Sequence, residues 1–311
     1  MEEFKHYTVM KNEAIEYFDF SKDALFVDAT LGGGGHSEEI LKRMTPNSHL
    51  IAFDIDDDAI NFAKERLKDY KNLTIVKDSY TNVKKVIHEL GYEKITGGIL
   101  FDLGASYHQL TKQERGFSFT KEAPLDMRFN KDADFSAYDV VNTYSESDLA
   151  KIFFEYGEER YSRKVAKRIV EKRAEKPIET TTELAEIVRH ALPYTKSRLH
   201  PATRVFQAIR IEVNNELKNV KETLNNLFDL LSEGAIISVI SFHSLEDRIV
   251  KETFKYYSKS CRCEMSEPIC KCGGPLLTLL VKKPITASEA ELNENPPSRS
   301  AKLRVAKYIK H

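Results

Sequence analysis

The chain has 311 residues, 41% hydrophobic and 31% charged, enough for one large domain or two of ordinary size with a sizeable core. Its 47 lysine and arginine residues nearly balance its 48 acidic residues, so a nucleic-acid partner must be argued from local patches. The start lacks the pattern of a signal peptide, and the apolar runs are far shorter than the ~20 residues that span a bilayer. We therefore expect a soluble, cytoplasmic protein without a membrane segment.

Short apolar runs alternate with amphipathic segments through the first hundred residues. The pattern predicts strands at residues 25–29, 50–55, 73–77 and 97–103, and helices at residues 37–44, 58–67 and 81–90. These strands are apolar along their length rather than on alternate residues. That pattern indicates a parallel sheet covered by helices on both faces.

The alternation breaks after Leu103, and residues 106–199 contain no convincing strand. Helix starts are predicted near Ser145, at Arg160 and after Thr180. The α/β pattern then resumes with helices at residues 200–231 and 244–257 and strands at residues 235–242, 276–282 and 302–309. This order predicts a Rossmann-like α/β core with a seven-stranded, mostly parallel sheet, made of residues 1–105 and 200–311. An all-helical domain for substrate recognition, residues 106–199, interrupts it.

Four consecutive glycines, at positions 32–35, lie between the first predicted strand and the first helix. Backbone without side chains can approach a ligand there, and the helix N–H groups face an anionic group. A dinucleotide fingerprint would need glycine or alanine where Ser37 stands, and a P-loop would need Gly-Lys-Ser/Thr rather than Gly-His-Ser. The pattern Asp28-x-x-x-Gly32-x-Gly34 instead resembles motif I of Rossmann-like methyltransferases, with Thr30 where many carry a first glycine. It predicts S-adenosylmethionine as the ligand, bound at Gly32 and Gly34.

Acidic residues end two further strands. Asp54 follows the second strand, where a carboxylate accepts hydrogen bonds from ribose hydroxyls, whereas the acidic run 56–58 is more simply a helix start. Tyr80 follows the third strand and is either a stacking face for adenine or a core aromatic. Asp102 ends the fourth strand, where it binds an amino group of the cofactor or substrate, or only caps the strand.

Longer motifs along the chain point to one family. They are Asp102-Leu103-Gly104-Ala105-Ser106, Glu114-Arg115-Gly116-Phe117-Ser118-Phe119, Pro124-Leu125-Asp126-Met127-Arg128, Tyr156-Gly157-Glu158-Glu159-Arg160, His200-Pro201-Ala202-Thr203-Arg204-Val205-Phe206-Gln207-Ala208-Ile209-Arg210, Ser241-Phe242-His243-Ser244-Leu245-Glu246-Asp247-Arg248 and Ser298-Arg299-Ser300-Ala301-Lys302-Leu303-Arg304. With these motifs the chain closely resembles the bacterial 16S ribosomal RNA (cytosine-N4) methyltransferases.

The resemblance implies methyl transfer from S-adenosylmethionine to N4 of a cytidine in the decoding region of 16S rRNA. The near-neutral net charge favours an assembled small ribosomal subunit over naked RNA as the substrate. Carried over by position, the cofactor contacts are Gly34, Gly35, His36, Asp54, Tyr80, Asp102 and Gln109. One departure stands beside them: Tyr107 and His108 replace the serine and proline that the family usually carries before this glutamine.

Cytosine N4 is a poor nucleophile because its lone pair is delocalised into the ring. Methyl transfer therefore needs the amine to be oriented and needs an acceptor for its proton. We expect Asp102, with Ser106 or backbone carbonyls nearby, to shape that pocket as the catalytic residue. His36 and His108 are more simply hydrogen-bonding or structural groups than bases.

Basic residues gather in the predicted insertion. Positions 160 to 176 contain two acidic residues and eight basic ones: Arg160, Arg163, Lys164, Lys167, Arg168, Lys172, Arg173 and Lys176. Alone, the pattern fits a solvated helix face with Val165 and Ile169 inward, but beside the resemblance it favours contact with RNA phosphates. A polar stripe on the next predicted helix, Arg204, Gln207, Arg210 and Asn214, shares one face and meets either the insertion or the RNA.

The cysteines are Cys261, Cys263, Cys270 and Cys272. Four thiolates could hold zinc, although C-x-C is tighter than the usual spacing, and a reduced loop without metal is the alternative. The sequence leaves this choice open, as it does the oligomeric state.

Other functions compete with the family's activity. A methyltransferase for DNA or a small molecule is one, and a non-catalytic RNA-binding or ribosome-assembly protein that keeps the cofactor fold is another. A dehydrogenase is disfavoured because the dinucleotide fingerprint fails.

Overall fold

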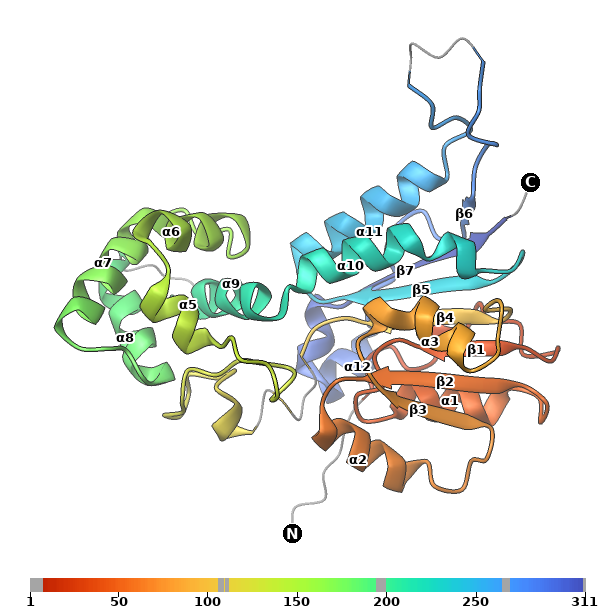
Figure 1. The fold of residues 1–311 in the computed structure, drawn as a ribbon, viewed down its shortest axis with the longest axis horizontal. Coiled ribbons are helices and arrows are strands. Elements are labelled where there is room, and N and C mark those ends of the chain that lie inside the picture. The colour runs from red at the N-terminus through yellow and green to blue at the C-terminus, as the bar shows by residue number, and fades with distance from the viewer. Residues whose placement is uncertain (1–7, 106–108, 110–111, 194–199, 265–268, 310–311) are drawn as a thin grey trace. The chain divides into compact units, whose positions relative to one another are not determined.

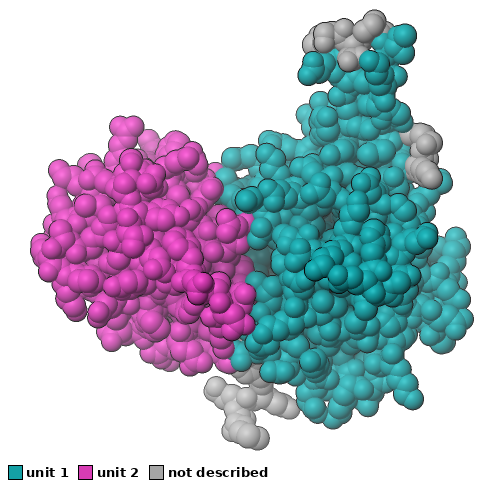
Figure 2. All heavy atoms as spheres, viewed as in Figure 1, with its two compact units in different colours: residues 1–104, 217–311 teal, residues 105–216 magenta. Residues whose placement is uncertain are grey.

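The computed structural model describes residues 8–105, 109, 112–193, 200–264 and 269–309. The chain forms two compact units, coloured separately in Figure 2. The first comprises Met1–Gly104 and Leu217–His311, and the second comprises Ala105–Glu216. Among the described residues, no helix combines the length and the apolar character that crossing a membrane requires.

A seven-stranded sheet forms the centre of the first unit, with strand order β3-β2-β1-β4-β5-β7-β6 (Figure 1). The strands are β1 (Leu25–Asp28), β2 (His49–Asp54), β3 (Leu73–Lys77), β4 (Gly98–Asp102), β5 (Ile236–Ser241), β6 (Leu277–Leu279) and β7 (Lys302–Tyr308). The first five run parallel, and β7 pairs antiparallel with both β5 and β6. The predicted seven-stranded, mostly parallel sheet is confirmed.

Helices cover both faces of this sheet. They are α1 (Gly35–Arg43), α2 (Asp57–Arg66), α3 (Val83–Glu89), α10 (Glu216–Asn226), α11 (Ser244–Tyr257) and α12 (Glu289–Glu294). Alternate residues of β1 enter opposite clusters: Leu25 and Val27 pack with residues of α3, α10 and α11, while Phe26 packs with residues of α1 and α2. Burial on both faces explains why the strands are apolar along their length.

The second unit is built from helices around its own core. They are α5 (Ala137–Thr143), α6 (Glu146–Glu155), α7 (Ser162–Glu175), α8 (Thr181–Ala191) and α9 (Thr203–Asn214). Two of the predicted helix starts carry the expected caps: Ser145 accepts from the N–H of Asp148, and Thr180 accepts from the N–H of Glu183.

The helix predicted over residues 200–231 is wrong as a single element. It divides at Asn215, whose φ of 51° is left-handed, a conformation that asparagine tolerates better than most residues. α9 therefore belongs to the second unit, and α10 continues into the first. The two compact units divide between Glu216 and Leu217, whereas the sequence-based boundary lies between residues 199 and 200.

The polar stripe of α9 is used inside the second unit. The Asn214 side chain accepts from the N–H of Phe129 at 2.7 Å and donates to the carbonyl of Met127 at 2.8 Å. The Gln207 amide donates to the carbonyl of Tyr156 at 3.0 Å. The remaining two members bond within the unit as well: Arg204 to the Glu158 carbonyl and Arg210 to the Glu216 carboxylate. The stripe thus meets the insertion, and its contact with RNA stays a prediction.

The turn at Gly116 depends on a close approach of backbone to backbone. Gly116 has a φ of 67°, and a Cβ there would lie 2.2 Å from the carbonyl oxygen of Pro124. The neighbouring Arg115 donates to the carbonyls of Arg128 and Phe129 at 2.8 and 3.0 Å. Two motifs that carry the family resemblance are therefore bound to each other within this unit.

We predict that Gly116→Ala destabilises the protein more than Gly91→Ala. Both glycines have positive φ, 67° and 84°, but no atom of the described residues lies within 4 Å of a Cβ at Gly91. Gly91→Ala therefore loses only the about 1–2 kcal/mol of unfolding free energy that a left-handed backbone conformation costs a residue with a Cβ. Gly116→Ala has the same cost and must also displace the Pro124 backbone. Denaturant unfolding measures both, and equal losses would contradict the contact.

Candidate active site

Three acids lie at the carboxyl edge of the sheet. Asp28 ends β1, Asp54 ends β2 and Asp102 ends β4. Asp28 pairs in register with Ala52 of β2 and with Leu100 of β4, two residues before the other acids. Parallel strands end at a common edge, so the glycine turn that follows β1 lies between Asp54 and Asp102.

Asp28 connects β1 to the start of α1. One carboxylate oxygen accepts from the N–H of Thr30 at 3.1 Å, and the other accepts from the Ser37 hydroxyl at 2.7 Å. The side chain is fully buried, and burial raises the pKa of Asp28 to about 6. This acid positions the glycine turn.

Two hydrogen bonds join the turn to the neighbouring strands. The Thr30 hydroxyl accepts from the backbone N–H of Asp102 at 2.6 Å, and the N–H of Gly32 donates to Asp54 at 2.8 Å. The hydroxyl explains the departure from motif I, because a glycine at position 30 could not make the bond to β4. The turn is therefore fixed to β4 on one side and to β2 on the other.

Asp54 keeps capacity for a ligand. Its second oxygen accepts from the N–H of Asp56 at 2.9 Å, and burial raises the pKa of Asp54 to about 6. A carboxylate has about four acceptor positions, so positions remain for ribose hydroxyls. The acidic run 56–58 starts a helix, as predicted, since Asp56 caps α2 by accepting from the N–H of Asp58.

The glycines of the turn serve different purposes. Gly32 has a φ of 49°, and among the described residues the nearest atom to a Cβ there would be the Thr30 carbonyl oxygen at 3.9 Å. A Cβ at Gly34, which has a φ of 74°, would lie 3.1 Å from Leu67, and one at Gly35 would lie 1.8 Å from the Thr8 hydroxyl. Packing within the protein thus explains Gly34 and Gly35 as glycines, while Gly32 faces open space. Their contacts with a cofactor stay predictions.

His36 is held in the first turn of α1. Its Nε2 lies 2.9 Å from the carbonyl oxygen of Val9, and because a carbonyl only accepts, Nε2 carries the proton. Its Nδ1 then faces the carboxylate of Asp102 at 3.6 Å. The ring is buried, so this histidine lies beside the acid and does not reach into solvent.

Asp102 lies near three other acidic side chains. Burial, followed by the negative charges of Asp28, Glu246 and Glu291, raises the pKa of Asp102 well above its usual range. The side chain as a whole is 26% exposed, but its Oδ1 is buried and has no hydrogen-bond partner among the described residues. A buried carboxylate oxygen in negative surroundings lacks a cationic or hydrogen-donating partner. S-adenosylmethionine fits this environment, since it carries a sulfonium and an ammonium group.

The two acids beside Asp102 come from distant segments that sequence reasoning did not assign. Glu246 is buried near the start of α11 and accepts from the N–H of Phe242 at 2.8 Å. Glu291, in α12, accepts from the N–H of Met10 at 2.9 Å. Glu246 lies in one of the family motifs, which was a usable signal, whereas no local pattern marks Glu291.

The remaining predicted site residues are less tightly placed. Tyr80 follows β3 and packs edge-on against Phe101, with ring centroids 5.7 Å apart. Its side chain is half-buried, so it packs in the core, as one alternative predicted, and also keeps part of its surface accessible. Gln109 is buried in the second unit, and Ser106, Tyr107 and His108 lie outside the described residues. The first unit thus brings together six of the eight predicted cofactor residues around the turn: Gly32, Gly34, Gly35, His36, Asp54 and Asp102.

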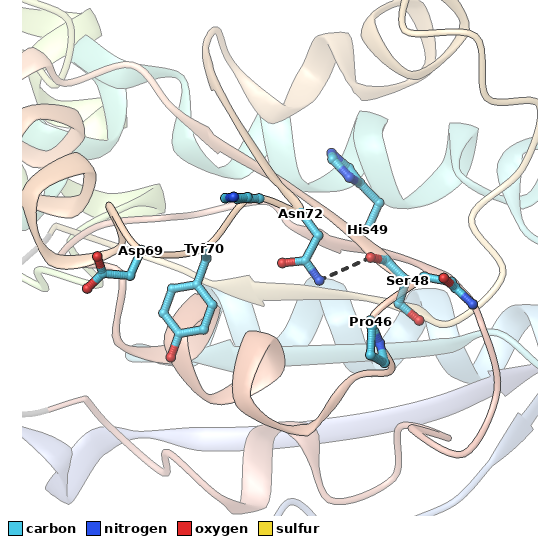
Figure 3. Close-up of a pocket in the computed structure, with 8 residues that line it drawn as sticks. Pro46, Ser48, His49, Asp69, Tyr70 and Asn72 are labelled. Carbon is cyan, nitrogen blue, oxygen red and sulfur yellow. Dashed lines mark hydrogen bonds between the residues drawn. The ribbon is translucent and has the colours of Figure 1, made fainter.

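A separate hollow lies at the opposite edge of the sheet, where β2 and β3 begin (Figure 3). Two short segments line it, and the Asn72 amide donates across it to the Ser48 carbonyl at 3.3 Å. It contains neither the glycine turn nor the acids at the strand ends. The candidate site is therefore at the carboxyl edge and not in this hollow.

We predict that, at pH values up to 7, affinity for S-adenosylmethionine rises with pH as Asp102 loses its proton. Burial and the neighbouring acids raise the pKa of Asp102, which favours its protonated form in the free protein, whereas a cationic ligand favours the ionised form. Binding must therefore release that proton, so affinity increases until the pH exceeds the free pKa. The ligand's own amino group stays protonated in this range, since its pKa is about 8.

Calorimetric titration of the wild type and Asp102→Asn at several pH values tests this prediction. The variant has no proton to release at this position and should show a flatter dependence. Equal slopes in the two proteins would show that Asp102 does not face the cation.

The chain resembles known proteins over nearly its whole length. Residues 3–309 match the model of the MraW methylase family. The chain is 51% identical over 309 residues to ribosomal RNA small subunit methyltransferase H of Clostridium botulinum (strain Loch Maree / Type A3), covering 99% of this chain and 100% of that protein. It is 50% identical over 307 residues to the protein of that name from Caldicellulosiruptor bescii, covering 98% and 100%. The chain therefore belongs to the MraW methylase family, and its cofactor is S-adenosylmethionine.

Proposed function

We propose that this protein transfers the methyl group of S-adenosylmethionine to N4 of a cytidine in 16S rRNA of the small ribosomal subunit. The relatives are named as small-subunit ribosomal RNA methyltransferases, which supports the class of substrate. The observation that carries the chemistry is the unpartnered Oδ1 of Asp102 at the carboxyl end of β4, beside the glycine turn. The bound cofactor supplies an electrophilic methyl group at this edge.

The residues at the carboxyl edge have separate roles in binding the cofactor and orienting the cytosine amine. Asp54 accepts hydrogen bonds from the ribose, and the N-terminus of α1, exposed through Gly32, receives the anionic end of the cofactor. Asp102 accepts a hydrogen bond from the cytosine amine, and this bond orients the nitrogen lone pair toward the methyl group. As the new N–C bond forms, the Asp102 carboxylate stabilises the positive charge that develops on the nitrogen. The raised pKa of Asp102 suits this task, since a more basic carboxylate is a better proton acceptor.

RNA recognition is assigned to the second unit through α7. Several of its cations have partners within the protein. Arg173 donates to the carbonyls of Val141 and Tyr144. Arg168 forms an ion pair with Glu171, and Lys172 forms one with Glu175. Arg163 and Lys167 are exposed and form no ion pair within the described part of the chain. They are four positions apart on one helical face, a spacing that suits contact with successive phosphates.

Exposed aromatic rings accompany these cations. Tyr161 precedes α7, is 41% exposed, and lies beneath the Lys164 ammonium at 5.5 Å. Phe154, on the neighbouring α6, is 63% exposed. Aromatic faces beside free cations are typical of surfaces that bind unpaired bases of folded RNA.

We expect Asp102→Asn to lower the rate of methyl transfer to small ribosomal subunits by about 10²–10⁴-fold at saturating cofactor, because the amide cannot accept the proton. The matched control is Asp69→Asn, an exposed acid at the opposite edge of the sheet, which should keep the wild-type rate. Single-turnover transfer of labelled methyl groups measures both. A wild-type rate in Asp102→Asn would rule out the proposed role.

The double charge reversal Arg163→Glu with Lys167→Glu should weaken binding to 16S rRNA by at least about tenfold and reduce its salt dependence. Affinity for S-adenosylmethionine should not change, since neither residue is among the predicted cofactor contacts. The control is Lys218→Glu with Lys221→Glu, an exposed pair on α10 with the same change in net charge. Equal losses in both variants, measured by filter binding, would indicate a general charge effect and not a surface on α7.

A further inference from the structure

The four cysteines come together within the segment between α11 and β6, and this segment extends away from the sheet (Figure 1). Cys261 and Cys263 lie on the outgoing arm, and Cys270 and Cys272 lie on the returning arm. All four sulfur atoms lie within 4.8 Å of one another. They are the only cysteines of the chain, and each has a free thiol.

The spacing of the sulfurs is that of a tetrahedral metal site. Cys270 lies 3.5 Å from Cys261, 3.9 Å from Cys263 and 3.4 Å from Cys272. Four thiolates bound to zinc at 2.3 Å would stand about 3.8 Å apart along the edges of a tetrahedron. A disulfide needs about 2.05 Å between two sulfurs, and it would leave no reason for the other pair to join the same cluster.

Backbone N–H groups support the charge of thiolates in this cluster. The N–H of Arg262 donates to Cys272 and that of Lys271 donates to Cys263, each at 3.2 Å. Each donor lies between the two cysteines of one arm and reaches a sulfur of the other arm. The C-x-C spacing, tighter than usual, is therefore what places one donor on each arm.

Arg262 adds a positive charge beside the sulfurs. Its guanidinium donates to the carbonyl of Cys272 at 2.8 Å and to that of Gly274, and it lies 5.7 Å from the ring of Tyr257 at the end of α11. A divalent ion with four thiolates has a net charge of −2, which this cation partly offsets.

The described residues of the segment form no hydrophobic core of their own. None of its described residues between Ser258 and Leu276 is buried, and Ile269 is 72% exposed. Short segments that cannot bury apolar surface need a cross-link or a metal to hold one conformation. The cluster lies where such a link closes the loop.

We propose that Cys261, Cys263, Cys270 and Cys272 bind one structural Zn²⁺ that closes the segment between α11 and β6. Four protein ligands leave no open coordination position, so the ion holds the loop and takes no part in methyl transfer. The inference is independent of the proposed function, since its site contains none of the residues at the glycine turn.

Metal analysis of the untagged, full-length chain, purified without chelators, tests the proposal. We expect one zinc per chain by mass spectrometry of the metal, and release of all of it when a mercurial reagent has titrated four thiols. Cys263→Ser with Cys270→Ser should hold less than a tenth as much zinc, and the control Ser260→Ala in the same segment should hold the wild-type amount. Affinity for S-adenosylmethionine should be the same in all three proteins, which also reports that each is folded.

A second measurement does not depend on the variants. Zinc is removed from the wild type with the mercurial reagent, the thiols are regenerated, and Co²⁺ is added under reducing conditions. Intense visible bands of tetrahedral cobalt together with thiolate-to-cobalt charge-transfer bands are expected at one equivalent. Two disulfides in the freshly purified chain, zinc retained by the double variant, or a weak octahedral cobalt spectrum would each overturn the proposal.

Discussion

The parallel register of β1 with β2 and β4 is the constraint on which the candidate site depends. It brings Asp54 and Asp102 to either side of the turn that follows Asp28. Two hydrogen bonds then fix the turn between them: Gly32 to Asp54, and the Asp102 N–H to Thr30. A shift of either strand by one residue would turn its terminal acid to the opposite face of the sheet. The two faces pack into separate clusters, and a shift would exchange the side chains that fill them, so the packing of the core helps to determine the geometry of the polar site.

Much of this arrangement could be predicted from the sequence because its signals are local. Apolar runs give the strands, and acids after them mark the strand ends. The break at Asn215 escaped prediction because asparagine in the left-handed region leaves no mark as strong as glycine or proline. Glu291 escaped because its position beside Asp102 depends on packing between segments almost two hundred residues apart. The glycines illustrate a third limit: Gly35 is explained by the Thr8 side chain, which no turn pattern contains.

The acidic side chains around Asp102 lower the stability of the folded protein when Asp102 is ionised. Asp28, Glu246 and Glu291 all disfavour its ionised form, and one of its oxygens is buried without a partner among the described residues. Local conflicts of this kind are expected at functional sites, where a ligand supplies the missing interaction. In the proposed function a cationic methyl donor removes this conflict on binding, so the charges that destabilise the free site would favour such a cofactor over a neutral one.

The central claim is that this edge of the sheet methylates the amine of a ribosomal cytidine. Its most direct test is the chemical identity of the product. Small ribosomal subunits lacking the modification are incubated with the protein and S-adenosylmethionine carrying a labelled methyl group, and the 16S rRNA is digested to nucleosides for chromatography and mass spectrometry. The account predicts that the label is in N4-methylated cytidine. Label at a ring carbon, on a ribose or in another nucleoside, or no transfer at all, would contradict it.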